Sequence, residues 1–276
     1  MNGNWSLWLR QMLAVTRLEL KTSFSPRRAL PIYVLALMPF VIFAGHAFMH
    51  LRGWQTCSGG SDLTIFAGVF QIFVLRLALF FGCVVVFLNL FRGEVVQKSL
   101  HYWFLAPVRR EVLVAGKYLA GAITAATVFT ASTALSYLVL VKHMESTASR
   151  GLAASAMGQL PAYMGVTALA CLGYGAVFLL MGVLFRNPII PAVLVLLWES
   201  LIVFVPALLK KISVIFYLES LCPVRVPFEG PGALFAIPAA PSPAYVALPG
   251  LLVLAFALVA LTAVRVRSME IRYGTD

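Results

Sequence analysis

The chain has 276 residues, of which 61% carry hydrophobic side chains and 11% are charged, and its mean hydropathy is +0.93. Soluble domains carry about 25% charged residues, so this composition excludes an ordinary soluble protein and indicates an integral membrane protein. The formal net charge is +11. We interpret the excess of Lys and Arg mainly as a signal of membrane topology, and nucleic-acid binding is not expected from it.

Residues 1–28 precede the first long apolar segment and are predicted to form an amphipathic helix at the membrane surface. Its apolar face comprises Trp5, Trp8, Leu9, Met12, Leu13 and Leu20, and a basic stripe beside it comprises Arg10, Arg17 and Lys21. Indole rings at the boundary and cations near lipid phosphate are typical of a helix in the headgroup region. The alternative is a cytoplasmic helix that packs on its own protein. The stretch has no short apolar core followed by a small-residue cleavage site, so a cleavable signal is not expected.

Six segments are apolar over about 20 residues, the length that crosses a hydrocarbon core of roughly 30 Å. They are about 30–49, 65–91, 119–141, 161–185, 188–209 and 247–264. The fourth and fifth are separated only by residues 186–188 and are predicted to form a hairpin. Small residues recur in the third and fourth segments, which allows close helix packing in a membrane. The predicted fold is all-α and polytopic, with residues 29–276 as one transmembrane domain.

Lys and Arg are distributed unevenly between the two sides of this six-span arrangement. The side that holds both termini and residues 92–117 carries 14 of them, against 6 on the other side. Because short loops rich in Lys and Arg stay in the cytoplasm, both termini and residues 92–117 are predicted to be cytoplasmic. The chain is expected in the cytoplasmic (inner) membrane.

Residues 92–117, with the sequence RGEVVQKSLHYWFLAPVRREVLVAGK, form an unusually polar connection between two spans. A short amphipathic helix is predicted from Glu94 to Leu105, and it ends near Pro107 because proline biases the preceding residue away from helix. A basic turn at Arg109 and Arg110 and a second short helix follow. Two short helices that meet at a bend would form a protruding cytoplasmic element.

The same stretch contains no phosphate-binding loop. Its Gly116-Lys117 pair is followed by Tyr118, and Glu111 occupies the position where such a loop has its first glycine. The chain is therefore expected to hold no nucleotide site and no cofactor of its own.

In residue pattern, this stretch resembles the second cytoplasmic region of the permeases of ABC type-2 transporters. In that family the region carries a glutamate, then a glycine followed by Thr-Leu, then a proline, and a Gly-Lys ending ten residues after the proline. The matching residues here are Glu94, Ser99 with Leu100, Pro107, the basic Arg110, and Gly116 with Lys117. Lys98 stands where the family has its glycine, which leaves the local backbone turn open. The lead-in RLELKTSFSPRRAL, which includes Glu19, is similar to the polar helix before the first span in such permeases.

The resemblance implies the membrane subunit of an ATP-driven exporter, without enzymatic activity of its own. A separate ATPase, in two copies and carrying ATP and Mg²⁺, would dock on residues 92–117 and drive alternating access, and a second identical or similar permease subunit would complete the transporter. The residues expected at the ATPase interface are Arg92, Glu94, Lys98, Ser99, His101, Tyr102, Pro107, Arg109, Arg110 and Lys117. The alternative is an interfacial aromatic belt within an ordinary positive loop.

Two ionisable residues, Arg76 and Glu199, lie inside predicted spans, each about 16 Å deep at a rise of 1.5 Å per residue. Charges at that depth are costly and usually pair or face a cavity. We therefore predict that Arg76 and Glu199 lie close together, within one chain or across a dimer. The resemblance implies that spans two and five line the translocation route. The pair would be a gate or a substrate contact, or a static bridge that fixes packing.

Residues 210–246 are too apolar for an ordinary exposed loop and too interrupted by proline to form a span. They are predicted to form short interfacial or re-entrant pieces on the outer face, as an exit lid or a plug. Elsewhere, His46 and His50 have helical spacing but lack an accompanying carboxylate, so an interfacial pair is expected and no metal site. Cys57 and Cys222 are both expected on the outer side, as a disulfide or as two thiols.

Three classes of function compete for this sequence. The first is the exporter permease. The second is an ATP-independent secondary transporter or channel, but the connections in the two halves of the chain differ in length, against the symmetry of inverted repeats. The third is an intramembrane enzyme, for which few buried polar residues are available.

Overall fold

The computed structural model describes residues 5–24, 26–52, 59–96, 103, 105, 107–146, 150–185, 187–226, 237 and 242–268. Within these residues every regular element is a helix, which confirms the predicted all-α fold. Five helical stretches are long and apolar enough to cross a membrane: Ala29–Met49, Asp62–Phe91, Arg110–Glu145, Gly151–Leu184 and Ala244–Arg267. The chain is therefore a multi-pass membrane protein.

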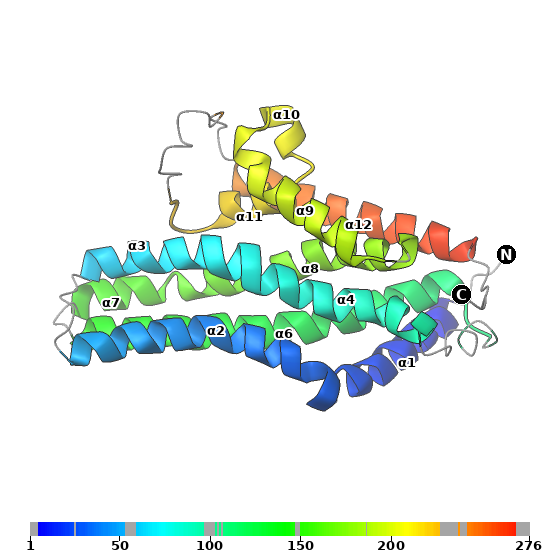
Figure 1. Ribbon diagram of the computed structural model, residues 1–276, viewed down its shortest axis with the longest axis horizontal. Helices are drawn as coiled ribbons and strands as arrows, with labels where there is room; N and C mark the ends of the chain where they lie inside the picture. Colours follow the sequence, from blue (N-terminus) through cyan, green and yellow to red (C-terminus); the bar gives the residue numbers. More distant parts are fainter. Residues whose placement is uncertain are drawn as a thin grey trace.

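The helices follow the chain in a simple order. They are α1 (Trp5–Ser23), α2 (Pro26–Leu51), α3 (Gly59–Val69), the π-helix η1 (Phe70–Ala78), α4 (Leu79–Val96), α6 (Arg110–Ser146), α7 (Arg150–Met157), α8 (Leu160–Leu184), α9 (Ile189–Leu201), the 3₁₀ helix η2 (Ile202–Phe204), α10 (Ala207–Lys210), α11 (Val214–Leu221) and α12 (Ala244–Arg267). Figure 1 shows α2, α4, α6 and α8 running lengthwise, with α9 to α12 along one side of this group. Helix α6 packs against α8, α2, α1 and α12.

Close packing between α4, α6 and α8 depends on glycine, as the small residues of the sequence predict. The ring of Phe87 on α4 lies between two glycines, Gly121 on α6 and Gly175 on α8. A Cβ atom at Gly121 would stand 2.8 Å from the Phe87 ring, and one at Gly175 would stand 2.3 Å from it. Both distances are too short for nonbonded carbon atoms, so neither position has room for a larger residue unless Phe87 moves.

The fifth predicted span, 188–209, is not confirmed as one helix. Helix α9 and η2 together cover Ile189–Phe204, about 24 Å at 1.5 Å per residue, which is less than the roughly 30 Å of a hydrocarbon core. The chain then becomes extended at Val205, with φ −94° and ψ 148°. The physical reason is Pro206, which disfavours helical backbone at the residue before it.

Residues 206–221 fold back against the middle of the helix bundle. Ser213 begins α11 as its N-cap, and its side chain accepts a hydrogen bond from the backbone N–H of Phe216. Val214 then reaches Gly173, where an added Cβ would stand 2.8 Å from Val214 Cγ1. Gly173 lies at the midpoint of α8, so α11 is a short helix inserted at mid-length. Residues 227–236 and 238–241, the other part of the predicted outer region, lie outside the described residues.

The start of α6 and the end of α12 meet at one end of the bundle. Arg110 Nη1 donates hydrogen bonds to the carbonyl oxygens of Val266, at 3.0 Å, and Arg267, at 2.9 Å. The C-terminal carbonyls of a helix lack partners within the helix, and Arg110 satisfies two of them in α12. The same end of the bundle holds α1, because Gln11 Nε2 donates to the carbonyl oxygen of Pro107 at 3.0 Å.

Candidate functional site

A buried cluster of charged side chains joins α1, α4 and α6, and Lys117 lies at its centre. Lys117 stands about two turns into α6, and its side chain is fully buried. Its Nζ atom donates to a carboxylate oxygen of Glu19 on α1, to Glu94 Oε1 on α4 at 2.7 Å, and to the carbonyl oxygen of Leu90 at 3.1 Å. All three donor hydrogens of the ammonium group thus have an acceptor.

Two aromatic rings complete the surroundings of the Lys117 ammonium. The ring centroid of Trp103 lies 4.9 Å from Nζ, and that of Phe91 lies 5.4 Å from it. Both distances fall within the range of cation–π attraction. The indole Nε1 of Trp103 also donates to Glu94 Oε1 at 2.8 Å. Trp103 therefore ties the connection between α4 and α6 to the buried charges.

The cluster contains two carboxylates, Glu19 and Glu94, and one ammonium group. Glu94 lies beyond the apolar stretch Asp62–Phe91. Burial raises the pKa of the Glu94 carboxyl above its usual 4.5, and nearby Glu19 raises it further, while Lys117 lowers it without cancelling the rise. The net rise follows from desolvation, which disfavours the charged form of the Glu94 carboxyl.

Helix α1 can reach this cluster because Gly116 allows it to approach α6. An added Cβ at Gly116 would stand 2.9 Å from the side chain of Val15 and 3.1 Å from the carbonyl oxygen of Met12. Thr16 Oγ1 donates to the carbonyl oxygen of Gly116 at 3.1 Å. Glycine at this position thus brings the α1 backbone close to α6, and Glu19 follows one turn after Val15.

Helix α1 packs against α6. This is the alternative predicted for residues 1–28, a helix that packs on its own protein. Val15, Thr16 and Glu19 are the buried residues of α1. Several residues of the predicted apolar face stay exposed: Trp5, Leu9 and Leu13. One side of α1 therefore packs on the protein, and another presents the apolar surface that a headgroup-level helix needs.

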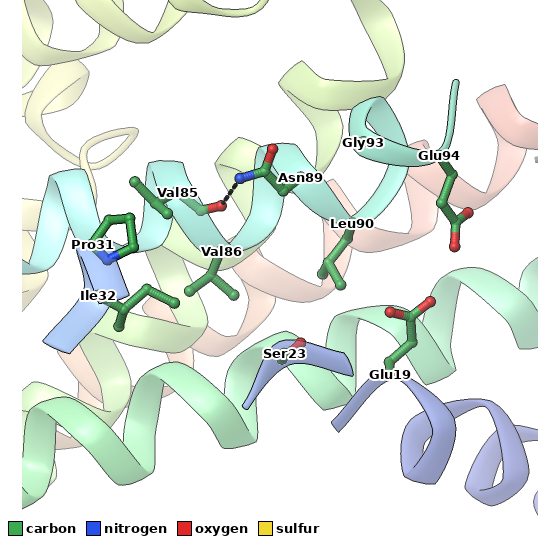
Figure 2. A pocket seen from close by; sticks show the side chains of 10 residues that line it. All are labelled: Glu19, Ser23, Pro31, Ile32, Val85, Val86, Asn89, Leu90, Gly93 and Glu94. Atoms are coloured by element: carbon green, nitrogen blue, oxygen red, sulfur yellow. Dashed lines mark hydrogen bonds between the residues drawn. The ribbon is translucent and has the colours of Figure 1, made fainter. Parts of the chain in front are cut away.

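A cavity of about 280 Å³ lies next to the charge cluster, between α1, α2 and α4. Figure 2 shows the carboxylates of Glu19 and Glu94 pointing toward each other at one end of it. The remaining wall is mostly apolar and comprises Ser23, Pro31, Ile32, Val85, Val86, Asn89, Leu90 and Gly93. The cavity thus has an acidic end and an apolar end.

The structure places some of the predicted interface residues on the surface and one in the interior. Pro107 and Arg109 are exposed, and the Arg109 guanidinium lies 4.4 Å from the ring centroid of Trp8. Lys117 is different: it was expected on a docking surface, but the two glutamates hold it in the interior. Several predicted residues lie outside what the structure describes, namely Lys98, Ser99, His101, Tyr102 and the side chain of Arg92.

The polar connection is also shorter than predicted. Helix α4 continues through Val96, and α6 begins at Arg110 without a break before its span. Residues 92–96 and 110–117 are therefore extensions of the spans, and only residues 97–109 connect them. The predicted second short helix does not exist as a separate element, because no proline or glycine cap interrupts α6 after Arg110.

The second predicted site brings Arg76 and Glu199 together, but their side chains do not form the ion pair. Arg76 Nη1 donates to the backbone carbonyl oxygen of Glu199 at 3.3 Å, and Arg76 Nη2 pairs with Glu219 Oε1 at 2.6 Å. The Glu199 carboxylate instead accepts hydrogen bonds from Ser213 Oγ and from the backbone N–H groups of Val214 and Ile215. Glu199 therefore satisfies the free N–H groups at the start of α11.

The π-helix η1 places two of its polar side chains against the inserted segment. Arg76 holds Glu219 on α11, and Gln71 Nε2 donates to the carbonyl oxygen of Val224 at 2.7 Å. A π-helix is rare and often marks a functional position. Here it carries the contacts that fix residues 213–224 to the second predicted span.

Sequence reasoning missed two of the acidic partners, Glu19 and Glu219. The chain has only 10 Asp and Glu residues against 21 Lys and Arg. This scarcity of carboxylates was the sequence signal that could have identified Glu19 and Glu219 as partners. A buried cation has to find one of very few carboxylates. Their pairing with Lys117 and Arg76 nevertheless depends on contacts between segments about 98 and 143 residues apart.

Two minor predictions have partial outcomes. His46 was expected to have no carboxylate nearby, but its Nε2 atom lies 3.8 Å from Oδ1 of the buried Asp62. Cys222 is a free, buried thiol, and Cys57 and the side chain of His50 lie outside what the structure describes.

The chain matches no protein-family model and no curated protein sequence.

Proposed function

We propose that the chain is the permease subunit of an ATP-binding-cassette exporter in the cytoplasmic membrane. In this proposal it pairs with a second permease subunit, and two copies of an ATPase that binds ATP and Mg²⁺ dock beneath it. The proposal rests on the residue pattern of 92–117. One contact supports it above all others: Glu94 and Lys117, the first and last of the residues that match the family pattern, are hydrogen-bonded at 2.7 Å.

The contact matters because it ties the connection to both spans. Glu94 is near the end of α4, Lys117 is near the start of α6, and each helix continues without interruption into an apolar span. A displacement of residues 97–109 would therefore be carried into two spans at once. Helix α1 would follow, because Glu19 shares Lys117 and because Arg109 stacks on Trp8.

The docking surface in this proposal lies between Trp103 and Arg109. Leu105 has 79% of its surface exposed. Pro107 and Arg109 are exposed beside it. An apolar side chain flanked by arginine fits the buried centre of a protein interface.

The test is co-purification of the full chain with candidate ATPases, followed by an ATPase assay. Leu105→Glu should abolish co-purification or the stimulation of ATP hydrolysis. Leu208→Glu is the matched control, since Leu208 is also exposed and lies on α10 (Ala207–Lys210), outside the five membrane-crossing stretches and remote from the connection. Glu94 and Arg110 are unsuitable for this purpose, because they bond within the chain. Recovery of the chain without any nucleotide-binding partner would favour an ATP-independent transporter.

A further inference from the structure

A groove of about 680 Å³ runs between α2 and α6. It is lined by the small residues Ala36, Ala131 and Ser132 and by larger apolar side chains such as Leu37 and Leu135. Leu37, Ala131 and Leu135 are exposed. The groove therefore opens onto the surroundings of the helix bundle, and its volume falls within the 300–1,000 Å³ or so that is usual for ligand pockets.

The hydroxyl groups in the groove wall already have acceptors within the protein. Ser132 Oγ donates to the carbonyl oxygen of Ala36, and Thr127 Oγ1 donates to that of Ile123 at 2.7 Å. Apart from Tyr33, the other described lining residues are apolar. A wall of this kind suits hydrocarbon, because it offers a polar ligand almost nothing to bind.

The groove follows one half of the membrane-crossing length of α2. Tyr33 and Phe40, which both line it, lie four and eleven residues into the apolar stretch Ala29–Met49, or about 6 Å and 16 Å along the helix. The hydrocarbon core is roughly 30 Å thick, so the groove ends near the middle of the membrane. Phe24, which precedes the apolar stretch, lines the other end. The groove thus extends over one leaflet, as an acyl chain does.

Two cations, Arg17 and Lys21, lie on the side of α1 that leads to this groove. They precede Phe24 by seven and three residues, the spacings that put residues on one face of a helix. The Phe24 N–H still donates to the carbonyl oxygen of Leu20 at 3.1 Å, as in a helix. Both cations are exposed, and no ion pair holds either of them within the part of the chain that the structure describes. The acidic residue of α1, Glu19, is buried in the charge cluster.

A membrane lipid fits these two features better than a second copy of the chain. In a symmetric dimer the same surface of each copy faces the other, so a groove would face a groove, and the cations would approach their own counterparts. An anionic lipid instead brings a negative phosphate to the cations and hydrocarbon to the groove. Lys and Arg side chains near the membrane surface attract such lipids.

We propose that the groove between α2 and α6 binds one anionic phospholipid of the surrounding membrane, with an acyl chain in the groove and the phosphate at Arg17 and Lys21. Figure 1 shows the corner at which α1 meets α2, and Phe24 belongs to that corner. The headgroup would therefore lie where the surface helix turns into the first span. This site does not depend on the proposed exporter function.

The groove can be filled without changing the charges. Ala131→Leu would place a longer apolar side chain in the groove, because Ala131 lines it and is exposed. Ala257→Leu is the matched control, since Ala257 is an exposed alanine on another membrane-crossing helix, α12, and does not line the groove.

The charges can likewise be removed without changing the groove. The double variant Arg17→Gln, Lys21→Gln removes two positive charges from its polar end. The double variant Lys211→Gln, Arg225→Gln is the control, because it removes two exposed cations that flank α11, remote from α1. Both double variants lower the net charge of the chain equally.

The experiment titrates the full chain in detergent with dioleoyl phosphatidylglycerol or dioleoyl phosphatidylcholine and counts bound lipids by native mass spectrometry. The first phosphatidylglycerol should bind about tenfold or more tightly than the first phosphatidylcholine, since two cations attract its phosphate. The Arg17, Lys21 variant should lose this preference, and Ala131→Leu should weaken the binding of both lipids. Both controls should bind as the unchanged protein does, and glycerol 1-phosphate, which has no acyl chain, should not compete.

Several results would overturn the proposal. Equal affinity for the two lipids would do so, as would unchanged phosphatidylglycerol binding in both Ala131→Leu and the Arg17, Lys21 variant. Competition by glycerol 1-phosphate would assign the cations to a free phosphate. Conversion of a dimer to a monomer by Ala131→Leu, with lipid binding unchanged, would assign the groove to a second copy. Each variant is first checked for a monodisperse elution profile, and the Arg17, Lys21 variant carries the test if Ala131→Leu does not fold.

Discussion

Lys117 on α6 and Glu94 on α4 form an ion pair at a place where the Lys117 side chain has no exposed surface. The pair closes a connection whose two ends are 23 residues apart. Glu19 from α1 joins the same ammonium group. Three helices that enter the bundle separately are therefore held at one point, and the stability of that point can be measured.

Replacing Lys117 with Met should be strongly destabilising. The change removes the ammonium group that Glu19 and Glu94 share, and removal of one partner from a buried ion pair costs about 3–5 kcal/mol. Thermal unfolding of the detergent-solubilised protein should show a large fall in midpoint. Lys142→Met is the control and should change little, because the Lys142–Glu145 pair is exposed. A melting point equal to that of the control would show that the buried pair contributes no stability.

The raised pKa of Glu94 predicts a specific pH dependence. Between the usual value of 4.5 and the raised value, the folded protein holds a proton that the unfolded chain has released. Folding is therefore favoured at the acidic end of this window, and stability falls as pH rises through the folded pKa. Glu94→Gln removes this contribution.

Melting curves at several pH values, recorded for the unchanged protein and for Glu94→Gln, isolate the effect of Glu94. As pH rises, the melting temperature of the unchanged protein should fall relative to that of Glu94→Gln. The opposite trend would mean that Lys117 outweighs burial in setting the pKa of Glu94.

Gly116→Leu should loosen α1 from α6. The new side chain would overlap Val15 and press on the backbone of Met12, and overpacking of this kind costs about 1–3 kcal/mol. Trypsin should then cleave faster at the exposed Arg10 and Arg17 of α1. Gly165→Leu is the control, since no atom lies within 4 Å of an added Cβ at that position. Equal cleavage rates in the two variants would exclude a role for Gly116 in docking α1.

Glu199→Ala should release the start of α11. It removes the acceptor of hydrogen bonds from Ser213, Val214 and Ile215, and loss of a helix cap costs about 0.5–2 kcal/mol. Cys222, which directly follows α11 and is only 6% exposed, should become reactive toward maleimide. Ser200→Ala is the neighbouring control, because the Ser200 hydroxyl is exposed and bonds only within its own helix, to Leu196. An unreactive Cys222 in Glu199→Ala would show that α11 is held by other contacts.

Arg76→Gln tests the connection between η1 and α11 from the other side. It removes the ion pair with Glu219 and the hydrogen bond to the Glu199 carbonyl, so Cys222 should again gain maleimide reactivity. Arg225→Gln, a cation beyond α11, is the control. If Glu219→Gln has the same effect as Arg76→Gln and the double variant is no worse, the ion pair accounts for it. Effects that simply add would assign separate roles to the two residues.

The sequence alone determined the class of the protein and most of its helices. A segment of about 20 apolar residues in a membrane has to satisfy its own backbone hydrogen bonds, and a helix does so locally. Hydropathy therefore located the five long helices, and the effect of Pro206 on Val205 is equally local, although the prediction had carried the fifth span past it. The glycines of α6 and α8 could also be recognised from the sequence as positions of close helix packing, because glycine has no side chain.

Only the tertiary structure decided which charges meet. Arg76 and Glu199 were predicted to lie close together, and Arg76 does contact the Glu199 carbonyl. The ion pair nevertheless forms with Glu219, because α11 folds back to mid-length and offers a carboxylate there, while the N–H groups at its start bind the Glu199 carboxylate. Lys117 looked like a surface residue because a Gly-Lys pair in a polar connection carries no sign of burial. Its burial follows from Gly116, which brings α1 close enough for Glu19 to join Glu94. Pairings between residues far apart in the chain depend on how whole helices pack, and local sequence holds no record of that packing.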